Sequence, residues 1–291
     1  MPGDRVGVIA PAGPINRNDL EPGLERVESS GFRVCLGPNI YNRKDYLAGD
    51  DKARLSDLHA MFNDREIKAI FCARGGYGSL RLLDKINFEL IRENPKILVG
   101  FSDITALLLA INRKTGLVTL HGPMVGGLTS KDMENWNGLL ELVSSDRALL
   151  VGLTEGIALR PGRATGRLIG GNLTLICHLI GTPFMPSLNH GILFIEERGE
   201  TLYRVDRMLT QLRLSGQLEG LSGLMAGRFE ACGDTSDINR LLVEISSGLD
   251  IPVVSGLPVG HGMKNQALPL GVPARLDADL MTLSIMEPCI V

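Results

Sequence analysis

The chain has 291 residues, a formal net charge of −3 at pH 7 and 44% hydrophobic residues. This composition is typical of a globular protein with one large domain or two ordinary ones, and it argues against nucleic-acid binding, which requires a basic surface. The five cysteines lie far apart without a C-x-x-C pair, so we expect reduced thiols in a cytosolic protein: Cys35, Cys72, Cys177, Cys232 and Cys289.

The N-terminal segment contains an apolar run at 6–10, which is too short for the core of a signal peptide. The later apolar runs, such as 104–111, are much shorter than a membrane span. We therefore expect a soluble protein without a membrane partner.

Short apolar runs alternate with helical patterns through the first half of the chain. The runs predict strands at 6–10, 33–36, 69–72, 97–99 and 118–120, and a helix is expected at 51–63. This alternation is typical of βαβ units, so it predicts an α/β fold whose N-terminal sheet is mostly parallel and flanked by helices, as in Rossmann-like and amidotransferase-like proteins. Ligands of such sheets bind beyond the carboxyl ends of the strands.

A glycine-rich loop, Arg74-Gly75-Gly76-Tyr77-Gly78, follows one of these strands and precedes a helical pattern. Glycines let backbone N–H groups approach an anion closely, so the loop is a candidate donor to a reaction oxyanion. Its spacing matches neither G-x-G-x-x-G nor a P-loop, which leaves a non-catalytic nucleotide or anion site as a weaker alternative. A tight turn without any function is an equally good interpretation.

The next strand leads into Gly100-Phe101-Ser102-Asp103-Ile104, where a helical pattern begins. A serine between a strand and a helix resembles a nucleophile on a sharp turn, with the N–H groups of the helix facing a developing oxyanion. The simpler interpretation is that Ser102 or Asp103 caps the helix. Ile104 stands where the G-x-S-x-G motif needs a small residue, so an ordinary α/β-hydrolase is not expected.

The second half of the chain has a different pattern. The segment 153–166 contains prolines and glycines without strong periodicity, and we expect it to be a linker between a domain at 1–152 and a smaller, β-rich α/β domain at 167–291. Within the latter we predict strands at 191–195, 224–227 and 253–255, a helix at 205–214, and a hairpin at 276–285.

A serine nucleophile needs a base, and two of the five histidines stand out. His121 ends a predicted strand near the same sheet edge as Ser102, and His261 lies in a loop with flanking glycines. His59 and His178 fall in helical patterns, and His190 has no distinctive context. The residues alone leave His121 and His261 equally suited to the role.

The imidazole in turn needs a carboxylate that holds its tautomer. Glu196 ends the apolar run 192–195, where a charge is expensive to bury. Alternatively, Glu196 and Glu197 only mark the exit of this strand into solvent. There is no H-E-x-x-H motif, Cys/His cluster or paired-carboxylate spacing, so we expect no metal and no cofactor.

Several motifs form one combination along nearly the whole chain. They are Gly7-Val8-Ile9-Ala10-Pro11, the loop 74–78, Gly100-Phe101-Ser102-Asp103-Ile104-Thr105-Ala106-Leu107, His121-Gly122-Pro123-Met124, Gly170-Gly171-Asn172-Leu173, Phe194-Ile195-Glu196-Glu197, Tyr203-Arg204-Val205-Asp206-Arg207-Met208-Leu209 and Gly260-His261-Gly262. This combination resembles the serine L,D-carboxypeptidases, a family that includes murein tetrapeptide carboxypeptidases and microcin C immunity proteins.

The resemblance implies a catalytic triad of Ser102, Glu196 and His261. It also implies an oxyanion hole made by the backbone N–H groups of Asp103 and Gly75, with Gly76 as the alternative to Gly75. The family usually has Glu-Asp where this chain has Glu196-Glu197, which changes the neighbour of the proposed triad carboxylate.

Members of this family cleave the bond between an L-centre and a terminal D-residue, typically releasing D-alanine from cytoplasmic murein tetrapeptide in cell-wall recycling. The resemblance therefore implies a murein peptide substrate and a homodimer. For substrate binding we single out Arg74 and Arg204, because a guanidinium suits a terminal carboxylate. Gly76 and Tyr77, in the same loop as Arg74, are further candidates for substrate binding. A charged helix face is an alternative interpretation of Arg204.

Two other activities are weighed against this one. Related immunity proteins hydrolyse peptidyl nucleotides of the microcin C type, and an aromatic residue stacking on the base would favour that activity. The single tryptophan, Trp136, is expected on a helix surface instead. A cysteine enzyme using Cys72 is a further alternative, although Cys72 lacks a strand-turn-helix setting.

Overall fold

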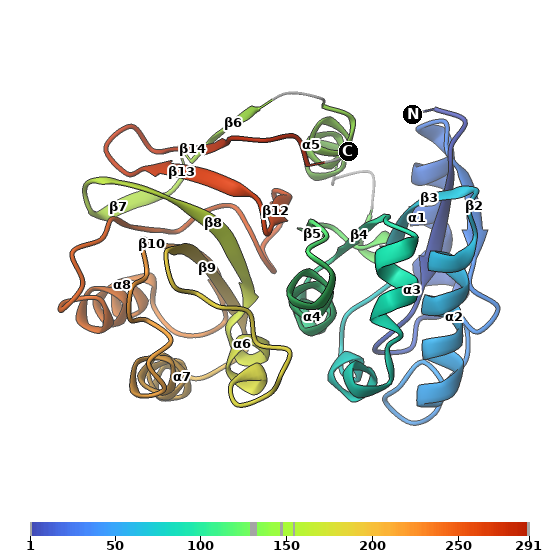
Figure 1. The fold of residues 1–291 in the computed structure, drawn as a ribbon, viewed down its shortest axis with the longest axis horizontal. Coiled ribbons are helices and arrows are strands. Elements are labelled where there is room, and N and C mark those ends of the chain that lie inside the picture. Colours follow the sequence, from blue (N-terminus) through green and yellow to red (C-terminus); the bar gives the residue numbers. More distant parts are fainter. Residues whose placement is uncertain (1, 129–132, 146–147, 154, 290–291) are drawn as a thin grey trace.

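The computed structural model describes residues 2–128, 133–145, 148–153 and 155–289, which form two β-sheets with helices packed around them (Figure 1). The first sheet has six strands in the order β12-β5-β4-β3-β1-β2. They are β1 (Arg5–Ile9), β2 (Arg33–Leu36), β3 (Ile67–Cys72), β4 (Ile97–Gly100), β5 (Thr119–His121) and β12 (Leu268–Leu270). Only β12 runs antiparallel to its neighbour, so the predicted mostly parallel sheet is confirmed.

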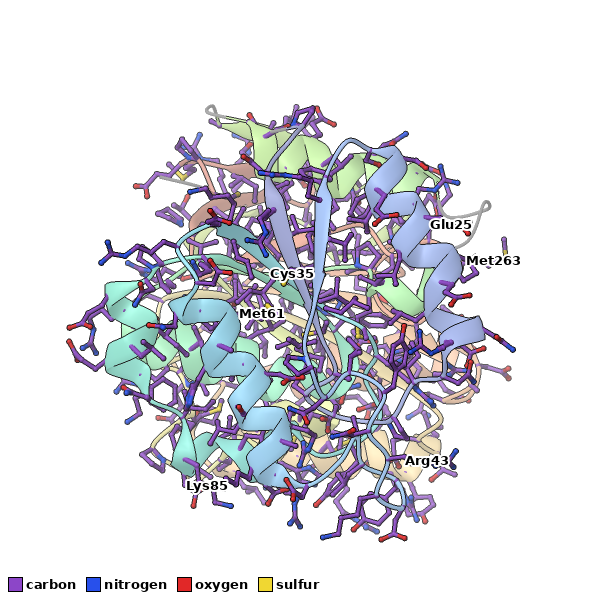
Figure 2. The ribbon with its side chains drawn as sticks, turned by 90° about the vertical axis from the view of Figure 1, so that its right-hand side faces the viewer. Glu25, Cys35, Arg43, Met61, Lys85 and Met263 are labelled. Carbon is purple, nitrogen blue, oxygen red and sulfur yellow. The ribbon has the colours of Figure 1, made fainter. Side chains whose placement is uncertain are left out.

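Helices cover both faces of this first sheet. They are α1 (Arg17–Ser29), α2 (Asp51–Asn63), α3 (Phe88–Glu93), α4 (Thr105–Thr115) and α5 (Met133–Ser144), with the 3₁₀ turns η1 (Ser79–Lys85), η2 (Ser102–Ile104) and η3 (Val125–Gly127). Val8 of β1 joins the core on the α1 side, while Ile9 joins the core on the α2 side, as the alternation of a strand requires. Figure 2 looks onto the edge at β2, with α1 and α2 on opposite sides of the strands.

The second sheet has eight strands in the order β6-β14-β13-β8-β9-β10-β11-β7. They are β6 (Leu149–Gly152), β7 (Ile157–Arg160), β8 (Arg163–Asn172), β9 (Gly191–Arg198), β10 (Gly223–Glu230), β11 (Val253–Ser255), β13 (Pro273–Asp277) and β14 (Thr282–Ile285). Its helices are α6 (Leu173–Leu179), α7 (Leu202–Leu214) and α8 (Thr235–Ile245). The predicted hairpin is present, and its turn is held by Asp277 Oδ1, which accepts from the backbone N–H of Leu280 at 2.9 Å.

The segment 153–166 is not the irregular linker that we expected. It contains β7 and the first residues of β8, and β7 pairs with β11 at the edge of the second sheet. Each sheet also contains a strand from the other predicted domain. β6, at 149–152, pairs with β14 of the second sheet, and β12, at 268–270, pairs with β5 of the first. β6 and β7 are both edge strands with exposed positions, and their short apolar runs, 149–151 and 157–159, lie next to or within the segment that we took for a linker, so the sequence analysis missed them.

One buried cluster continues from the first half of the chain into the second. Leu107 and Leu108 of α4 belong to the same cluster as Ile176 of α6 and Leu193 of β9. Figure 1 shows α4 between the two sheets. At its start, Thr105 Oγ1 accepts from the backbone N–H of Asn172 at 3.1 Å, which joins the N-terminus of α4 to the end of β8.

Candidate active site

Ser102 lies on a strained turn between β4 and α4. Its φ is 62°, in the left-handed region that non-glycine residues rarely adopt, and such strain is typical of functional positions. The Ser102 side chain forms no capping hydrogen bond, so the simple interpretation as an N-cap is wrong. Among the described residues, Ser102 Oγ has no hydrogen-bond partner, which leaves the hydroxyl available.

Gly75 lies directly against this serine. A Cβ built on Gly75 would be 3.0 Å from Ser102 Cβ and 3.1 Å from Ser102 Oγ, so a side chain here would crowd the hydroxyl. Gly76 approaches Gly13 instead, and the Gly75 carbonyl accepts from the backbone N–H of Gly13 at 2.8 Å. Of the two glycines that we considered, Gly75 is therefore the one beside Ser102.

The carboxylate of Asp103 joins the glycine loop to the serine turn. Its Oδ2 accepts from the backbone N–H of Ser79 at 2.8 Å, and the Ser79 hydroxyl donates to the Asp103 carbonyl. Burial raises the pKa of Asp103, and the hydrogen bonds from Ser79 partly oppose this rise. Asp103 thus caps η1, at the end of the glycine loop, rather than the helix that follows it in the chain.

The partly exposed His261 pairs with the buried carboxylate of Glu196. Nδ1 of His261 lies 2.7 Å from Oε2 of Glu196, whose side chain is fully buried. A hydrogen bond at Nδ1 fixes the tautomer and leaves Nε2 free to exchange a proton. The His261 ring packs 4.9 Å from the ring of Phe101, the residue before Ser102, although no hydrogen bond joins His261 to Ser102 in the part of the chain described.

Gly260 permits the contact between the histidine and its carboxylate. Its φ is +108°, and a Cβ at this position would lie 2.6 Å from Glu196 Oε2. Only glycine both adopts this backbone conformation readily and lets the carboxylate approach so closely. Gly260 therefore allows His261 and Glu196 to pack together.

The other candidate base, His121, lies behind Phe101. Its ring is fully buried, 5.7 Å from the Phe101 ring and 5.1 Å from the Phe194 ring, and neither of its nitrogens has a hydrogen-bond partner. Burial and, to a lesser extent, repulsion by His261 lower the pKa of His121 to about 3. Because His121 does not reach solvent, the structure favours His261 as the base.

Glu196 and Glu197 are both buried, so the interpretation that they mark an exit into solvent is wrong. Glu197 accepts from the side-chain amide of Asn172 at 2.9 Å and from the backbone N–H of Thr174 at 2.8 Å. It also accepts from the backbone N–H of Arg198 at 2.9 Å. Glu197 thereby caps α6 and supports the strand that carries Glu196, a role that the sequence signalled only through the motif containing Asn172.

Two buried asparagines hold the loop that carries His261. Asn265 Oδ1 accepts from the backbone N–H of Gly260 at 2.9 Å, and its own N–H donates to Asn135 Oδ1 at 2.9 Å. Asn135, on α5, also donates to the carbonyl of Met263 at 3.0 Å. No sequence signal links Asn135 to a loop about 130 residues away, so sequence reasoning missed this pair.

Arg54 is a further residue that the sequence analysis missed. Its guanidinium donates through Nη1 to the carbonyls of Pro11 and Gly78, the latter at 2.8 Å, and through Nη2 to Asp51 Oδ1 at 2.6 Å. The sequence did contain a signal that Arg54 is buried, since it lies four residues before Leu58 and therefore on the same buried face of α2.

The predicted substrate-binding residues are not gathered in one place. Arg74 is exposed and donates to the carbonyl of Pro14 at 2.9 Å, and Tyr77 packs edge-on against Tyr46, so both lie on the loop beside Gly75. Arg204 lies on the exposed face of α7. It pairs with Glu200 at 3.2 Å. Within the described residues, its side chain makes no hydrogen bond or ion pair with Ser102, Glu196 or His261.

The residues that would support the alternative activities, Cys72 and Trp136, are both buried. Cys72 is inaccessible, and burial raises the pKa of its thiol, which disfavours the thiolate that a cysteine nucleophile needs. Trp136 is 1% exposed and donates to Ser30 Oγ at 2.7 Å, so our expectation that it lies on a helix surface was wrong. Over the described ranges, no three His, Cys, Asp or Glu residues gather as a metal site, and none of the helices is long and apolar enough to cross a membrane.

Models of known families match both halves of the chain. Residues 6–122 match the LD-carboxypeptidase N-terminal domain, and residues 165–276 match the LD-carboxypeptidase C-terminal domain. The chain belongs to the LD-carboxypeptidase family. The resemblance inferred from the motifs is thus confirmed.

Relatives within the LD-carboxypeptidase family align over nearly the whole chain. A probable murein peptide carboxypeptidase of Bacillus subtilis is 40% identical over 291 residues, covering 94% of this chain and 89% of the relative. The murein tetrapeptide carboxypeptidase of Pseudomonas aeruginosa is 36% identical and covers 94% of both chains. A solved structure of MccF in complex with glutamyl sulfamoyl guanosine matches with a TM-score of 0.94 and 26% identity, covering 100% of this chain and 98% of MccF. An LD-carboxypeptidase is a peptidase, and the two-domain α/β fold of MccF is the fold seen here.

Proposed function

We propose that this protein is a serine L,D-carboxypeptidase that releases the terminal D-alanine from murein tetrapeptide in the cytoplasm during cell-wall recycling. The observation that carries the proposal is the contact of His261 with the buried Glu196, at 2.7 Å, in which the imidazole packs beside the strained turn of Ser102. The carboxypeptidase relatives support the choice of substrate.

In the proposed mechanism, Ser102 Oγ attacks the carbonyl carbon between the L-centre and the terminal D-residue. His261 Nε2 accepts the serine proton, and Glu196 stabilises the imidazolium that forms. The backbone N–H groups of Gly75 and Asp103 stabilise the oxyanion. His261 then protonates the leaving amine of D-alanine and activates a water molecule that hydrolyses the acyl-enzyme. An approach of Ser102 to His261 on substrate binding would complete the triad, because catalytic hydrogen bonds are often long before the substrate binds.

A carboxypeptidase must also bind the terminal carboxylate of its substrate, and a guanidinium does so with two parallel hydrogen bonds. Arg74 is the better placed of our two candidates, because it lies on the loop of Gly75, whereas Arg204 already pairs with Glu200. Gly76 and Tyr77 would line the same side of the site. We further propose that the protein acts as a homodimer, as the family resemblance implies.

The test is the release of free D-alanine from murein tetrapeptide by the purified protein. We expect Ser102→Ala to lower the rate by about 10⁴-fold or more and Glu196→Gln by about 10³-fold or more, because both disable the triad. Ser56→Ala and His178→Gln, which change exposed side chains, are matched controls that should retain the wild-type rate. Absence of D-alanine release by the wild-type protein, or undiminished release by Ser102→Ala, would refute the proposal.

A second candidate function is the hydrolysis of a peptidyl nucleotide of the microcin C type, because the fold of this chain closely matches that of MccF. The only tryptophan does not favour it, since Trp136 is buried and cannot stack on a base. The same assay with a peptidyl nucleotide distinguishes the two substrates. Tight nucleotide binding without any hydrolysis would instead indicate a non-catalytic binding module.

A further inference from the structure

Arg54 carries a buried charge that stability alone does not explain. Among the residues that the structure describes, it is the only arginine or lysine with a buried side chain. Its partner Asp51 is shared with the exposed Arg81, which binds the same carboxylate at 2.9 Å. Replacing a buried ion pair by apolar side chains of similar volume is often neutral or stabilising, so the buried guanidinium of Arg54 suggests another use.

The guanidinium connects two loops at the carboxyl edge of the first sheet. Through one nitrogen, Nη1, it donates to the carbonyl of Pro11, in the loop after β1, and to the carbonyl of Gly78, which ends the glycine loop. A Cβ on Gly78 would lie 2.7 Å from Nη1, so the backbone of the glycine loop rests directly on the guanidinium.

The same two loops meet again beside the serine. The Gly75 carbonyl accepts from the backbone N–H of Gly13, two residues after Pro11. The glycine loop is therefore held at Gly75 by Gly13 and at Gly78 by Arg54, and the residue that follows it, Ser79, is held by Asp103. With both ends fixed in this way, the backbone of the loop has little freedom to shift relative to Ser102.

We propose that Arg54 is a positioning residue for the oxyanion hole, holding the loop after β1 and the glycine loop together so that the Gly75 N–H faces the carbonyl attacked by Ser102. The inference rests on the proposed function, because it assumes that Ser102 generates an oxyanion beside Gly75. Arg54 itself does not touch the substrate. A donor that is preorganised in this way acts on the transition state more than on the bound substrate.

The test compares Arg54→Met, Arg54→Lys and the control Arg81→Gln, which removes a partner of Asp51 without touching either loop. Two rates are measured on protein that is folded by circular dichroism: D-alanine release from murein tetrapeptide, and labelling of Ser102 by a fluorophosphonate. Labelling also places a charged oxygen in the oxyanion hole but needs no peptide substrate.

We expect Arg54→Met to lower kcat and the labelling rate by about a hundredfold while KM changes by less than about threefold. Arg54→Lys keeps the charge and can donate to the loop carbonyls but cannot also reach Asp51, so its two rates should fall between those of the wild type and Arg54→Met. Arg81→Gln should match the wild type in both rates. A loss of stability by itself would not produce this graded order at constant KM in folded protein.

Folded Arg54→Met with wild-type kcat and labelling would overturn the inference, as would equal losses in Arg54→Met and Arg54→Lys. If Arg54→Met does not fold, Arg54→Lys decides, and wild-type labelling by that variant overturns the inference. If the wild type is labelled at Ser102 but releases no D-alanine, the proposed substrate is wrong and the labelling rates alone test Arg54. A wild type that neither cleaves nor becomes labelled overturns both proposals.

Discussion

At the scale of single residues, the site contains buried polar side chains that have few hydrogen-bond partners. Glu196 is fully buried and binds His261, while His121 is buried nearby without any partner for its ring nitrogens. A neutral His121 does not oppose the positive charge that His261 acquires during the proposed reaction, whereas a cation at that position would. The low pKa of His121 is thus compatible with a working base beside it.

The burial of His121 predicts how stability depends on pH. Its pKa falls from an ordinary value of 6.5 to about 3 in the folded protein. Between these values the unfolded chain binds a proton that the folded chain does not, so the free energy of unfolding decreases as the pH falls from about 6.5 toward 3. We expect His121→Phe, whose ring packs in the same place but does not titrate, to show a shallower decrease.

Denaturant unfolding at several pH values between about 4 and 8 measures this slope. Ser56→Ala is the control, because Ser56 is exposed and does not titrate, so its replacement should leave the slope unchanged. An equally steep decrease in His121→Phe and the wild type would show that His121 does not contribute.

At the scale of elements, apolar runs in the sequence predicted several strands of both sheets. The apolar runs located β2 and β11 to the residue, and the helical pattern located α2 equally well. The analysis missed β6 and β7, whose apolar runs are only three residues long and whose partner strands β14 and β11 lie about 100 residues or more away in the sequence, so only the folded sheet identifies them. Sequence pattern therefore predicted the elements that carry Ser102 and Glu196 but not the limits of the two sheets.

Glu197 shows how one side chain supports two elements. Its carboxylate accepts from Asn172, Thr174 and Arg198, so its removal leaves three donors unsatisfied at the junction of β8, β9 and α6. We expect Glu197→Ala to lower the free energy of unfolding by about 2 to 4 kcal/mol, as measured by urea unfolding.

Glu244→Ala on α8 is the control for this prediction. Glu244 forms an exposed ion pair with Arg240, and such pairs contribute little, so the change should be close to zero. A Glu197→Ala variant as stable as Glu244→Ala would mean that the three donors find other partners, water included.

At the scale of the whole molecule, the two halves of the chain are joined rather than only placed side by side. β12 from the second half completes the first sheet, and the cluster around Leu107 and Leu193 continues through both halves. Chains of this length often unfold in more than one step, but a shared core disfavours an intermediate with only one half folded.

We therefore expect a single cooperative unfolding transition. Trp136 reports on the first half, because it packs against Phe71 and donates to Ser30, whereas far-ultraviolet circular dichroism reports on both halves. The two signals should change at the same urea concentration. Separate midpoints would show that the halves unfold independently.

The sequence by itself determined the parallel sheet, the turn of Ser102 and the family, because these depend on local apolar patterns and on motifs that are contiguous in the chain. It did not decide between His121 and His261 from the residues alone. That choice depends on burial, which is decided when β5 packs His121 behind Phe101 and the loop at Gly260 brings His261 to Glu196. The roles of Arg54 and Asn135 also came only from the tertiary structure, since each binds backbone groups that are distant in sequence and are brought near only by folding.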